Sequence, residues 1–420
     1  MADEGRMTRD VLWNFGALAV LAATGLLLNV LVGTRWSPEA LGVFNQGLAA
    51  YVFASMLATV GINHSLLRAL GGAGEDRRRS GTLVVAALVP TLALAAIVCA
   101  FFWAARHAVA GWLDSPGVAT AMEACTPGLF LFAVNKQLMA AINGWRRMRT
   151  FALLTALRYL GLLAALWLAA WRAWPADALM GIFSVAELAL FVVAGAEVAR
   201  HCGRPVAREL AAWMREHVSF GLKSAAAAAL LELNAKVDIW MLGLWLSDAK
   251  VGFYTWAAMF AEGFWQILVV LQNNLNPLLA KHLAAGELRE VEALSRKFKR
   301  RSFLLVLALG LASAPAYAWI VAWLDPGAGF EESIAPYWIL VAGVVGAAAW
   351  SPMAQILLMA NQPLRHSLLM LATVVVNVAA NALLIPAFGL EGAALGTAIA
   401  VCASAFFLVW SARRWIGVRL

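Results

Sequence analysis

Charged side chains interrupt the long apolar stretches of this sequence, where burying a charge is unfavourable unless the side chain meets water, a partner or a ligand. Lys and Arg side chains at such positions can bind an anionic group, and the planar fork of Arg can bind two oxygens of one phosphate. Asp and Glu side chains there can take up a proton or a Na⁺ ion. The candidate cations are Lys136, Arg158, Lys223 and Lys236, and the candidate acids are Glu187, Glu232, Asp238 and Glu262.

The positions of these charges along their stretches place several of them at similar depths. At 1.5 Å per helical residue, Lys136, Arg158 and Lys223 lie roughly 9 to 12 Å from the inner ends of three predicted membrane helices. We therefore expect a cationic cavity that attracts an anionic substrate, with acids that couple transport to H⁺ or Na⁺. The alternative is that bases and acids pair as contacts between helices. Glu232 and Lys236, four residues apart with the acid first, form the clearest local pair.

Composition defines the class of protein to which these charges belong. The chain has 420 residues, of which 63% are hydrophobic and 13% charged, and its mean hydropathy is +0.77. Apolar runs of about 18 residues or more recur from end to end, which indicates a multi-spanning α-helical membrane protein. We expect about 12 transmembrane helices, over residues 11–33, 40–66, 81–105, 118–144, 150–171, 177–199, 217–246, 251–280, 302–324, 334–360, 366–387 and 390–412.

The distribution of basic residues predicts the orientation. With the N-terminus inside, 24 of the 32 Lys and Arg residues fall in connections on the inner side and four on the outer side. Because cytoplasmic loops carry an excess of Lys and Arg, both termini are expected to be cytoplasmic. The net charge of +8 is then a topology signal and a contact for anionic membrane lipids, and nucleic-acid binding is not needed to explain it. The inner connection 283–301 is predicted to form an amphipathic helix with a basic face.

Weak internal similarity predicts a duplication. The linker 200–217 separates two halves, which we assign as residues 1–205 and 206–420, each a six-helix bundle. The two bundles are expected to be pseudo-symmetric and to surround a central cavity, as in transporters that bind substrate between repeats. The matching segments are Phe15-Gly16 with Phe220-Gly221, Leu41–Phe44 with Val251–Tyr254, and Asn143 with Asn361, at offsets of 205, 210 and 218 residues.

Several chemistries have no sequence support. The four cysteines are far apart and lack CxxC spacing, so neither a disulfide framework nor a metal site is expected. There is no Gly-rich phosphate loop, HExxH motif or nucleophile elbow, and the outer loops are too short for the paired carboxylates of a membrane glycosyltransferase. We therefore expect a protein that is not an enzyme and holds no cofactor. Without an ATP-binding segment, transport would draw on an ion gradient, the membrane potential or the substrate gradient.

The C-terminal quarter carries the most specific motif. Residues 377–400, NVAANALLIPAFGLEGAALGTAIA, closely resemble the N-x-x-L-I-P-x-x-G-x-x-G-A-A-x-A-T hallmark of polysaccharide-exporting flippases. These belong to the multidrug/oligosaccharidyl-lipid/polysaccharide exporter superfamily. A second hallmark is similar to residues 238–257, where Asp238, Gly243, Gly252 and Tyr254 match. The resemblance extends over the whole chain and is softer outside these motifs.

This resemblance implies a function. A member of the family would move an undecaprenyl-diphosphate-linked oligosaccharide, such as an O-antigen or exopolysaccharide repeat unit, from the cytoplasmic to the periplasmic leaflet of a bacterial inner membrane. Its cationic cavity would receive the diphosphate and sugars while the polyprenyl tail stays in lipid. Lys136, Arg158 and Lys223 are candidates on depth and charge alone. Polysaccharide polymerase and chain-length proteins are further candidate partners.

The sequence leaves two alternative functions open. A multidrug or cation antiporter of the same superfamily would favour an acidic, aromatic cavity, whereas the inner third of this membrane region is basic. A membrane polysaccharide polymerase or ligase, which is an enzyme, would need larger outer loops. Loss of a polymerase would leave single repeat units outside, whereas loss of a flippase would trap them inside.

Overall fold

The computed structural model describes residues 20–21, 23–71, 76–324 and 329–420, apart from the side chains of 223–235 and 324. Regular structure in these ranges is helical, with no β-strand. Among the described helices, eight are long and apolar enough to cross a membrane, or nine if a bent pair counts as one span. The predicted all-α fold of a multi-pass membrane protein is therefore confirmed, and twelve spans is an approximate number. The first predicted span, 11–33, is described only at residues 20–21 and 23–33.

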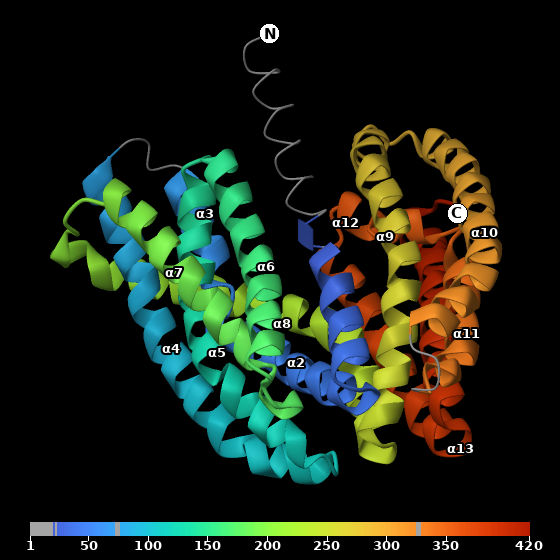
Figure 1. Cartoon of the computed structure of the whole chain (residues 1–420). Helices are drawn as coiled ribbons and strands as arrows, with labels where there is room; N and C mark the ends of the chain where they lie inside the picture. Colours follow the sequence, from blue (N-terminus) through green and yellow to red (C-terminus); the bar gives the residue numbers. More distant parts are fainter. Residues whose placement is uncertain (1–19, 22, 72–75, 325–328) are drawn as a thin grey trace. The chain divides into compact units, whose positions relative to one another are not determined.

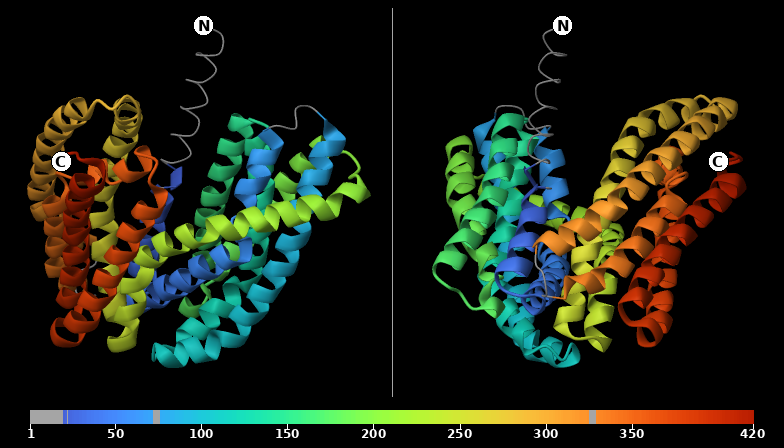
Figure 2. Two further views of the ribbon diagram at one scale, coloured as in Figure 1. Left: turned by 180° about the vertical axis from the view of Figure 1, so that it is seen from behind. Right: turned by 45° about the vertical axis from the view of Figure 1, so that its right-hand side comes forward.

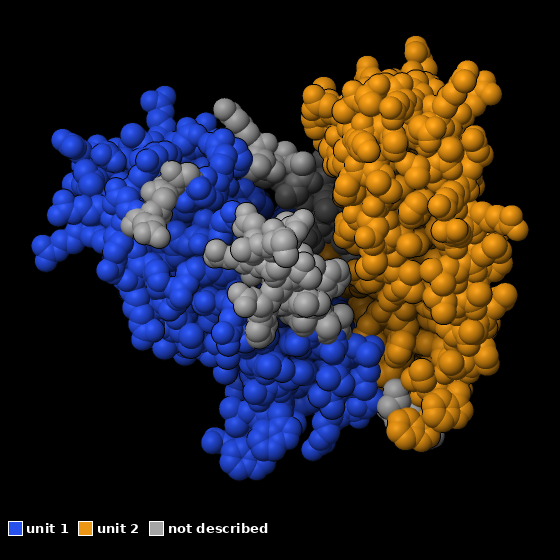
Figure 3. All heavy atoms as spheres, turned by 90° about the horizontal axis from the view of Figure 1, so that it is seen from above, with its two compact units in different colours: residues 1–36, 43–229 blue, residues 37–42, 230–420 orange. Residues whose placement is uncertain are grey.

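The chain divides into two compact units, which Figure 3 shows in different colours. Unit 1 comprises residues 1–36 and 43–229, and unit 2 comprises residues 37–42 and 230–420. The division at residues 205 and 206, which counts spans along the sequence, stays a prediction.

Unit 1 contains a bundle of helices that begin at recognisable capping residues. Asp76 accepts hydrogen bonds from the backbone N–H groups of Arg78 and Arg79, and so caps one helix. Pro116 opens the next helix, where its missing N–H group is harmless. In Figure 1 the elements are α2 (Pro38–Thr59, from residue 43 on), α3 (Ile62–Gly71), α4 (Arg77–Trp112), α5 (Pro116–Gly144), α6 (Met148–Trp171), η1 (Ala176–Ala178), α7 (Gly181–His201) and the first part of α8 (Ala207–Trp245).

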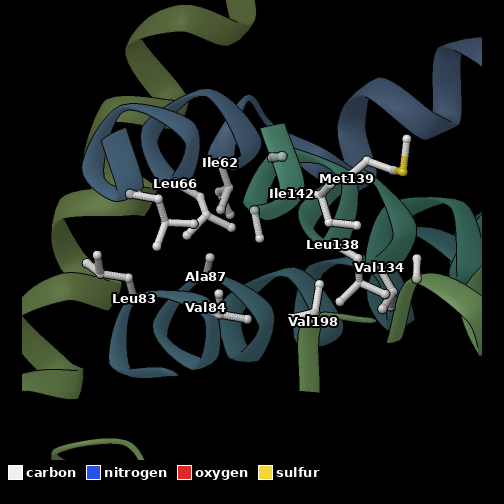
Figure 4. Packing of buried hydrophobic residues seen from close by; sticks show 14 of the residues in the cluster. Ile62, Leu66, Leu83, Val84, Ala87, Val134, Leu138, Met139, Ile142 and Val198 are labelled. Atoms are coloured by element: carbon white, nitrogen blue, oxygen red, sulfur yellow. The ribbon is translucent and has the colours of Figure 1, made fainter. Parts of the chain in front are cut away.

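The apolar core of unit 1 lies around α5. Helices α3, α4 and α7 all pack against it. Figure 4 shows side chains of these four helices meeting in one cluster, among them Leu66, Leu83, Leu138 and Val198. These four side chains are at most 4% exposed, so the helices present continuous apolar faces to one another. The core holds α5 in a fixed position between its neighbours.

Unit 2 is built from long helices, and its last one doubles back. Helix α13 contains a break at Gly389, whose φ of 58° is accessible to glycine with little strain. A Cβ atom on Gly392 would overlap the carbonyl oxygen of Leu384, so the two arms pack closely after the break. The break at Gly389 falls between the predicted spans 366–387 and 390–412. The elements are the rest of α8, α9 (Asp248–Ala284), α10 (Leu288–Leu324), η2 (Phe330–Ser333), α11 (Ile334–Ala347), η3 (Ser351–Met353), α12 (Ile356–Met359), α13 (Pro363–Ser411) and the π-helical turn η4 (Ala412–Ile416).

Two predicted spans are interrupted. The span predicted over 40–66 ends as a helix at Thr59, and α3 begins after Val60 and Gly61, both of which have positive φ. The span predicted over 334–360 bends by 60° between the Phe330–Ala347 and Ser351–Met359 segments. Hydropathy alone could not reveal either interruption, because the breaking residues are themselves apolar or small.

A reciprocal contact joins α2 and α9 within unit 2. A Cβ atom on Gly42 would overlap the carbonyl oxygen of Asp248, and a Cβ atom on Gly252 would overlap the carbonyl oxygen of Pro38. The four residues form two pairs of equivalent positions in the repeat. Asp248 follows Pro38 by 210 residues, and Gly252 follows Gly42 by the same offset, which is the one noted in the sequence. Small residues let helix backbones approach this closely. The repeat therefore places equivalent glycines at one crossing.

The third match between the two halves, Asn143 with Asn361, has a different alignment when the backbone turns are compared. Arg146 and Asn361 both have positive φ. The N–H group of each bonds the carbonyl three residues earlier, and the next N–H bonds five residues back, as at a Schellman helix end. These two turns pair Arg146 with Asn361, whereas residue identity had matched Asn143 with Asn361.

Candidate functional site

An ion pair links α6 and α7 inside unit 1. Arg158 Nε lies 2.8 Å from Glu187 Oε1, and Arg158 Nη2 donates to Glu187 Oε2 at 3.1 Å. Asn135 on α5 adds two donations through Nδ2, to Glu187 Oε2 and to the Glu187 carbonyl oxygen, both at 2.8 Å. The Glu187 side chain is 3% exposed and that of Arg158 is 18% exposed. The carboxylate is therefore held between two helices while the guanidinium keeps an open edge.

A close approach of α5 and α7 positions this ion pair. A Cβ atom on Gly128 would lie 2.7 to 2.9 Å from the backbone of Phe183 and Ser184. Ser184 Oγ accepts a hydrogen bond from Gly128 N and donates one to the Ala124 carbonyl oxygen. Glu187 follows Ser184 by one helical turn, and Asn135 follows Gly128 by two. The glycine contact therefore brings the amide and the carboxylate within hydrogen-bond distance.

An aromatic ring brings two of the predicted cations together. The Arg158 guanidinium lies 4.9 Å from the Phe132 ring centroid, and the Lys136 ammonium lies 5.3 Å from it. Tyr51 packs its ring against Phe132 edge-on, with the centroids 5.9 Å apart. Lys136 is exposed. Positive groups are attracted to ring faces, so Phe132 can keep both cations beside each other despite their mutual repulsion. With Glu187 included, these groups carry a net charge of +1 and can bind an anion.

A second polar cluster lies in unit 2, where three helices meet. Tyr254 on α9 donates a hydrogen bond to Asp238 Oδ2 on α8 at 2.6 Å, and Thr397 on α13 donates to the same oxygen at 3.4 Å. A Cβ atom on Gly396, next to Thr397, would lie 2.6 Å from Asn381 Oδ1. That amide oxygen is buried and has no hydrogen-bond partner among the described residues. Two hydroxyl groups and a carboxylate thus meet at Asp238, which can receive a proton or a small cation.

The remaining predicted residues are spread over α8 and α9. Lys236 is partly buried and lies two residues before Asp238. Glu262 is exposed on α9 and forms no ion pair with any described side chain. The side chains of Lys223 and Glu232 lie outside the described part of α8, so the proposed Glu232–Lys236 pair stays a prediction. The structure brings together Arg158, Lys136 and Glu187, and separately places Asp238 with new partners.

Several residues of both clusters carry no charge and were missed. Phe132 precedes Lys136 by four residues, a spacing that places both on one helical face and could have indicated the contact. Tyr254 belongs to a motif already noted. Asn135 lies within a predicted span, and its partner Glu187 is 52 residues away. Thr397 lies 159 residues from Asp238, and no local pattern indicates that pairing.

Comparison with known proteins places the chain in a family. The model of a family described as polysaccharide biosynthesis protein matches residues 7–282, more than half of the chain. The chain belongs to this family. No curated protein matches the sequence.

The fold of this polysaccharide biosynthesis family member is similar to that of several solved transporters. A lipid II flippase MurJ in an inward closed conformation has a TM-score of 0.76 and 11% identity, covering 96% of this chain and 87% of the other. An inward-facing multidrug resistance MATE transporter of the MOP superfamily has a TM-score of 0.75 and 14% identity, covering 94% of each chain. A MOP superfamily transporter from Pyrococcus furiosus has a TM-score of 0.61 and 13% identity, covering 98% and 95%. At these identities the likeness establishes the shared fold.

Proposed function

We propose that the protein is a flippase for an undecaprenyl-diphosphate-linked oligosaccharide, which it moves from the cytoplasmic to the periplasmic leaflet of a bacterial inner membrane by alternating access. The observation that carries the proposal is the cation pair Lys136 and Arg158 beside Phe132, at positions within membrane-spanning helices. Two positive side chains beside each other within membrane-spanning helices attract an anionic ligand. Membership of a polysaccharide biosynthesis family and the fold of a lipid II flippase support a lipid-linked sugar as that ligand.

Arg158 retains hydrogen-bonding capacity for a diphosphate. The guanidinium offers five N–H donors, and Glu187 engages it on the Nε and Nη2 side. The outer edge, with Nη1, is left for a phosphate oxygen, and the Lys136 ammonium can add a second charge-assisted contact. A cation antiporter would gain nothing from this arrangement, because two positive groups repel a cationic drug. Binding of organic cations in preference to sugar diphosphates would favour that rival.

A leaflet-resolved lipid assay tests the proposal. A strain lacking the gene should accumulate the lipid-linked intermediate in the cytoplasmic leaflet, and the wild-type gene should restore its appearance outside. We expect weak restoration by the Arg158→Ala/Lys223→Ala variant and by Lys136→Ala, because each removes positive charge from the proposed diphosphate site. Arg172→Ala is the matched control, since Arg172 is exposed and stacks on Trp171. Full restoration by the double variant would exclude these cations from transport, and accumulation of single repeat units outside would indicate a polymerase.

We further propose that Asp238 couples transport to H⁺ or Na⁺. The support is its hydrogen bonding to Tyr254 and Thr397 from two other helices of unit 2. Asp238→Asn removes the charge but keeps the shape, so substrate movement in proteoliposomes should no longer respond to an imposed Na⁺ or pH gradient. Glu331→Gln is the control, because that carboxyl is exposed on η2 and is not one of the candidate coupling acids. An undiminished gradient response in Asp238→Asn would exclude this residue as the coupling group.

A further inference from the structure

The third and fourth turns of α10 carry a dense group of cations. Positions 296–301 contain five basic residues and no acid. We call the exposed members Arg296, Lys297, Arg300 and Arg301 the α10 basic patch. The fifth, Lys299, points elsewhere and lies 4.9 Å from the Trp350 ring centroid. No acid among the described residues lies within ion-pair distance of the patch.

Two of the nearby acids are engaged by other groups, and a third, Glu290, is exposed and forms no ion pair with a described side chain. Glu287 Oε2 contacts His282 Nδ1 at 2.6 Å, and Glu292 Oε1 accepts from the backbone N–H of Arg419 at 2.9 Å. The opposite face of α10 is buried, with Val291, Ser295, Ser302 and Val306 at 0% exposure. The patch therefore faces away from the interior of unit 2, and Figure 1 shows α10 at the periphery of that unit.

The same helical face continues into apolar residues and ends in tryptophan. Leu304 and Leu311 follow Lys297 by seven and fourteen residues, which places them on its side of the helix, and they are 50% and 64% exposed. Trp319 is 64% exposed and stacks on Trp323, with the ring centroids 6.0 Å apart. From Arg301 to Trp319 the helix rises about 27 Å, close to the hydrocarbon thickness of about 30 Å. Cations at one end and tryptophans at the other are the residues that anchor a helix at the two membrane interfaces.

From this order of residues we infer that the α10 basic patch binds the phosphate headgroup of an anionic phospholipid, whose acyl chains lie along Leu304 and Leu311. A protein partner would not require the leucine face and the tryptophan end to match the thickness of a bilayer. A zwitterionic lipid would leave the four positive charges uncompensated, whereas juxtamembrane clusters of four or more Lys and Arg residues favour anionic headgroups. The site is independent of the oligosaccharide substrate and of the Arg158 cluster.

Native mass spectrometry of the purified full-length protein tests this inference, with phosphatidylglycerol and phosphatidylcholine as probes. We expect the wild type to prefer phosphatidylglycerol. The Arg296→Gln/Lys297→Gln/Arg300→Gln/Arg301→Gln variant should weaken that preference by more than about tenfold, and Arg301→Gln alone should weaken it less. Because these side chains are exposed, the variants should elute from size exclusion as the wild type does.

A second quadruple variant separates a defined site from general attraction by net charge. Lys281→Gln/Arg289→Gln/Arg413→Gln/Arg414→Gln removes four exposed cations outside the patch, so its net charge equals that of the first variant. It should keep the preference for phosphatidylglycerol. Equal losses in both quadruple variants, or an unchanged preference in the patch variant, would overturn the inference.

Discussion

Replacing Gly252 with alanine should lower the melting temperature of the protein strongly, and replacing Gly42 should do the same. The added Cβ atoms would overlap the backbone carbonyl oxygens of Pro38 and Asp248. A backbone atom cannot rotate away as a side chain can, so α2 and α9 would have to separate. Overpacking of this kind costs about 1–3 kcal/mol, and we expect the upper end because backbone meets backbone. Thermal unfolding in detergent gives the measurement.

Gly263→Ala on the same helix is the matched control. A Cβ atom there would meet nothing within 4 Å, and alanine favours a helix by up to about 1 kcal/mol over glycine. The control should therefore melt at or above the temperature of the wild type. If Gly252→Ala and Gly263→Ala melted alike, the close crossing of α2 and α9 would be wrong.

Glu187→Ala should destabilise unit 1 by about 3–5 kcal/mol, the usual effect of leaving one member of a buried ion pair without its partner. The Arg158 guanidinium would lose both contacts with the carboxylate, and Asn135 Nδ2 would lose its side-chain acceptor. Glu187→Gln should cost less, since its amide oxygen can still accept a hydrogen bond. The melting temperature of each variant reports this difference.

The double variant Arg158→Met/Glu187→Met distinguishes stability from transport. Replacing both charges with apolar side chains of similar size is often neutral or stabilising, so the melting temperature should recover toward that of the wild type. Transport should not recover, because Arg158, the residue proposed to bind the diphosphate, is absent. A double variant that flips substrate normally would show that the ion pair is structural only. A Glu187→Ala variant that melts like the wild type would contradict the pairing itself.

Sequence reasoning worked best where one residue type decides the outcome. Apolar runs long enough to span a membrane predicted the helices, and the boundary between the predicted spans 366–387 and 390–412 coincides with the break at Gly389, whose backbone angles few other residues adopt. The interruption at Val60 and Gly61 escaped notice, since valine is apolar and a single glycine is common in membrane helices. Hydropathy measures burial in lipid and is insensitive to a local change of backbone direction.

In the candidate site, too, the charged residues could be predicted from the sequence and the uncharged ones could not. Charges in apolar stretches are rare enough to be found by inspection, and Arg158 and Glu187 were both identified in this way. Their pairing was left open, because depth along a helix is readable from residue counts whereas rotation about the helix axis and packing against α5 are not. The contributions of Phe132 and Asn135 depend on that packing. Such uncharged residues become visible only once the helices are placed against one another.

The crossing of α2 and α9 has a bearing on the origin of the chain. Residue 42 meets residue 248, and residue 252 meets residue 38, which is the reciprocity of an isologous interface between identical subunits. An ancestral protein of half this length, assembled as a twofold homodimer, would form both contacts with a single glycine. Fusion of two gene copies would then have preserved that subunit interface inside one polypeptide.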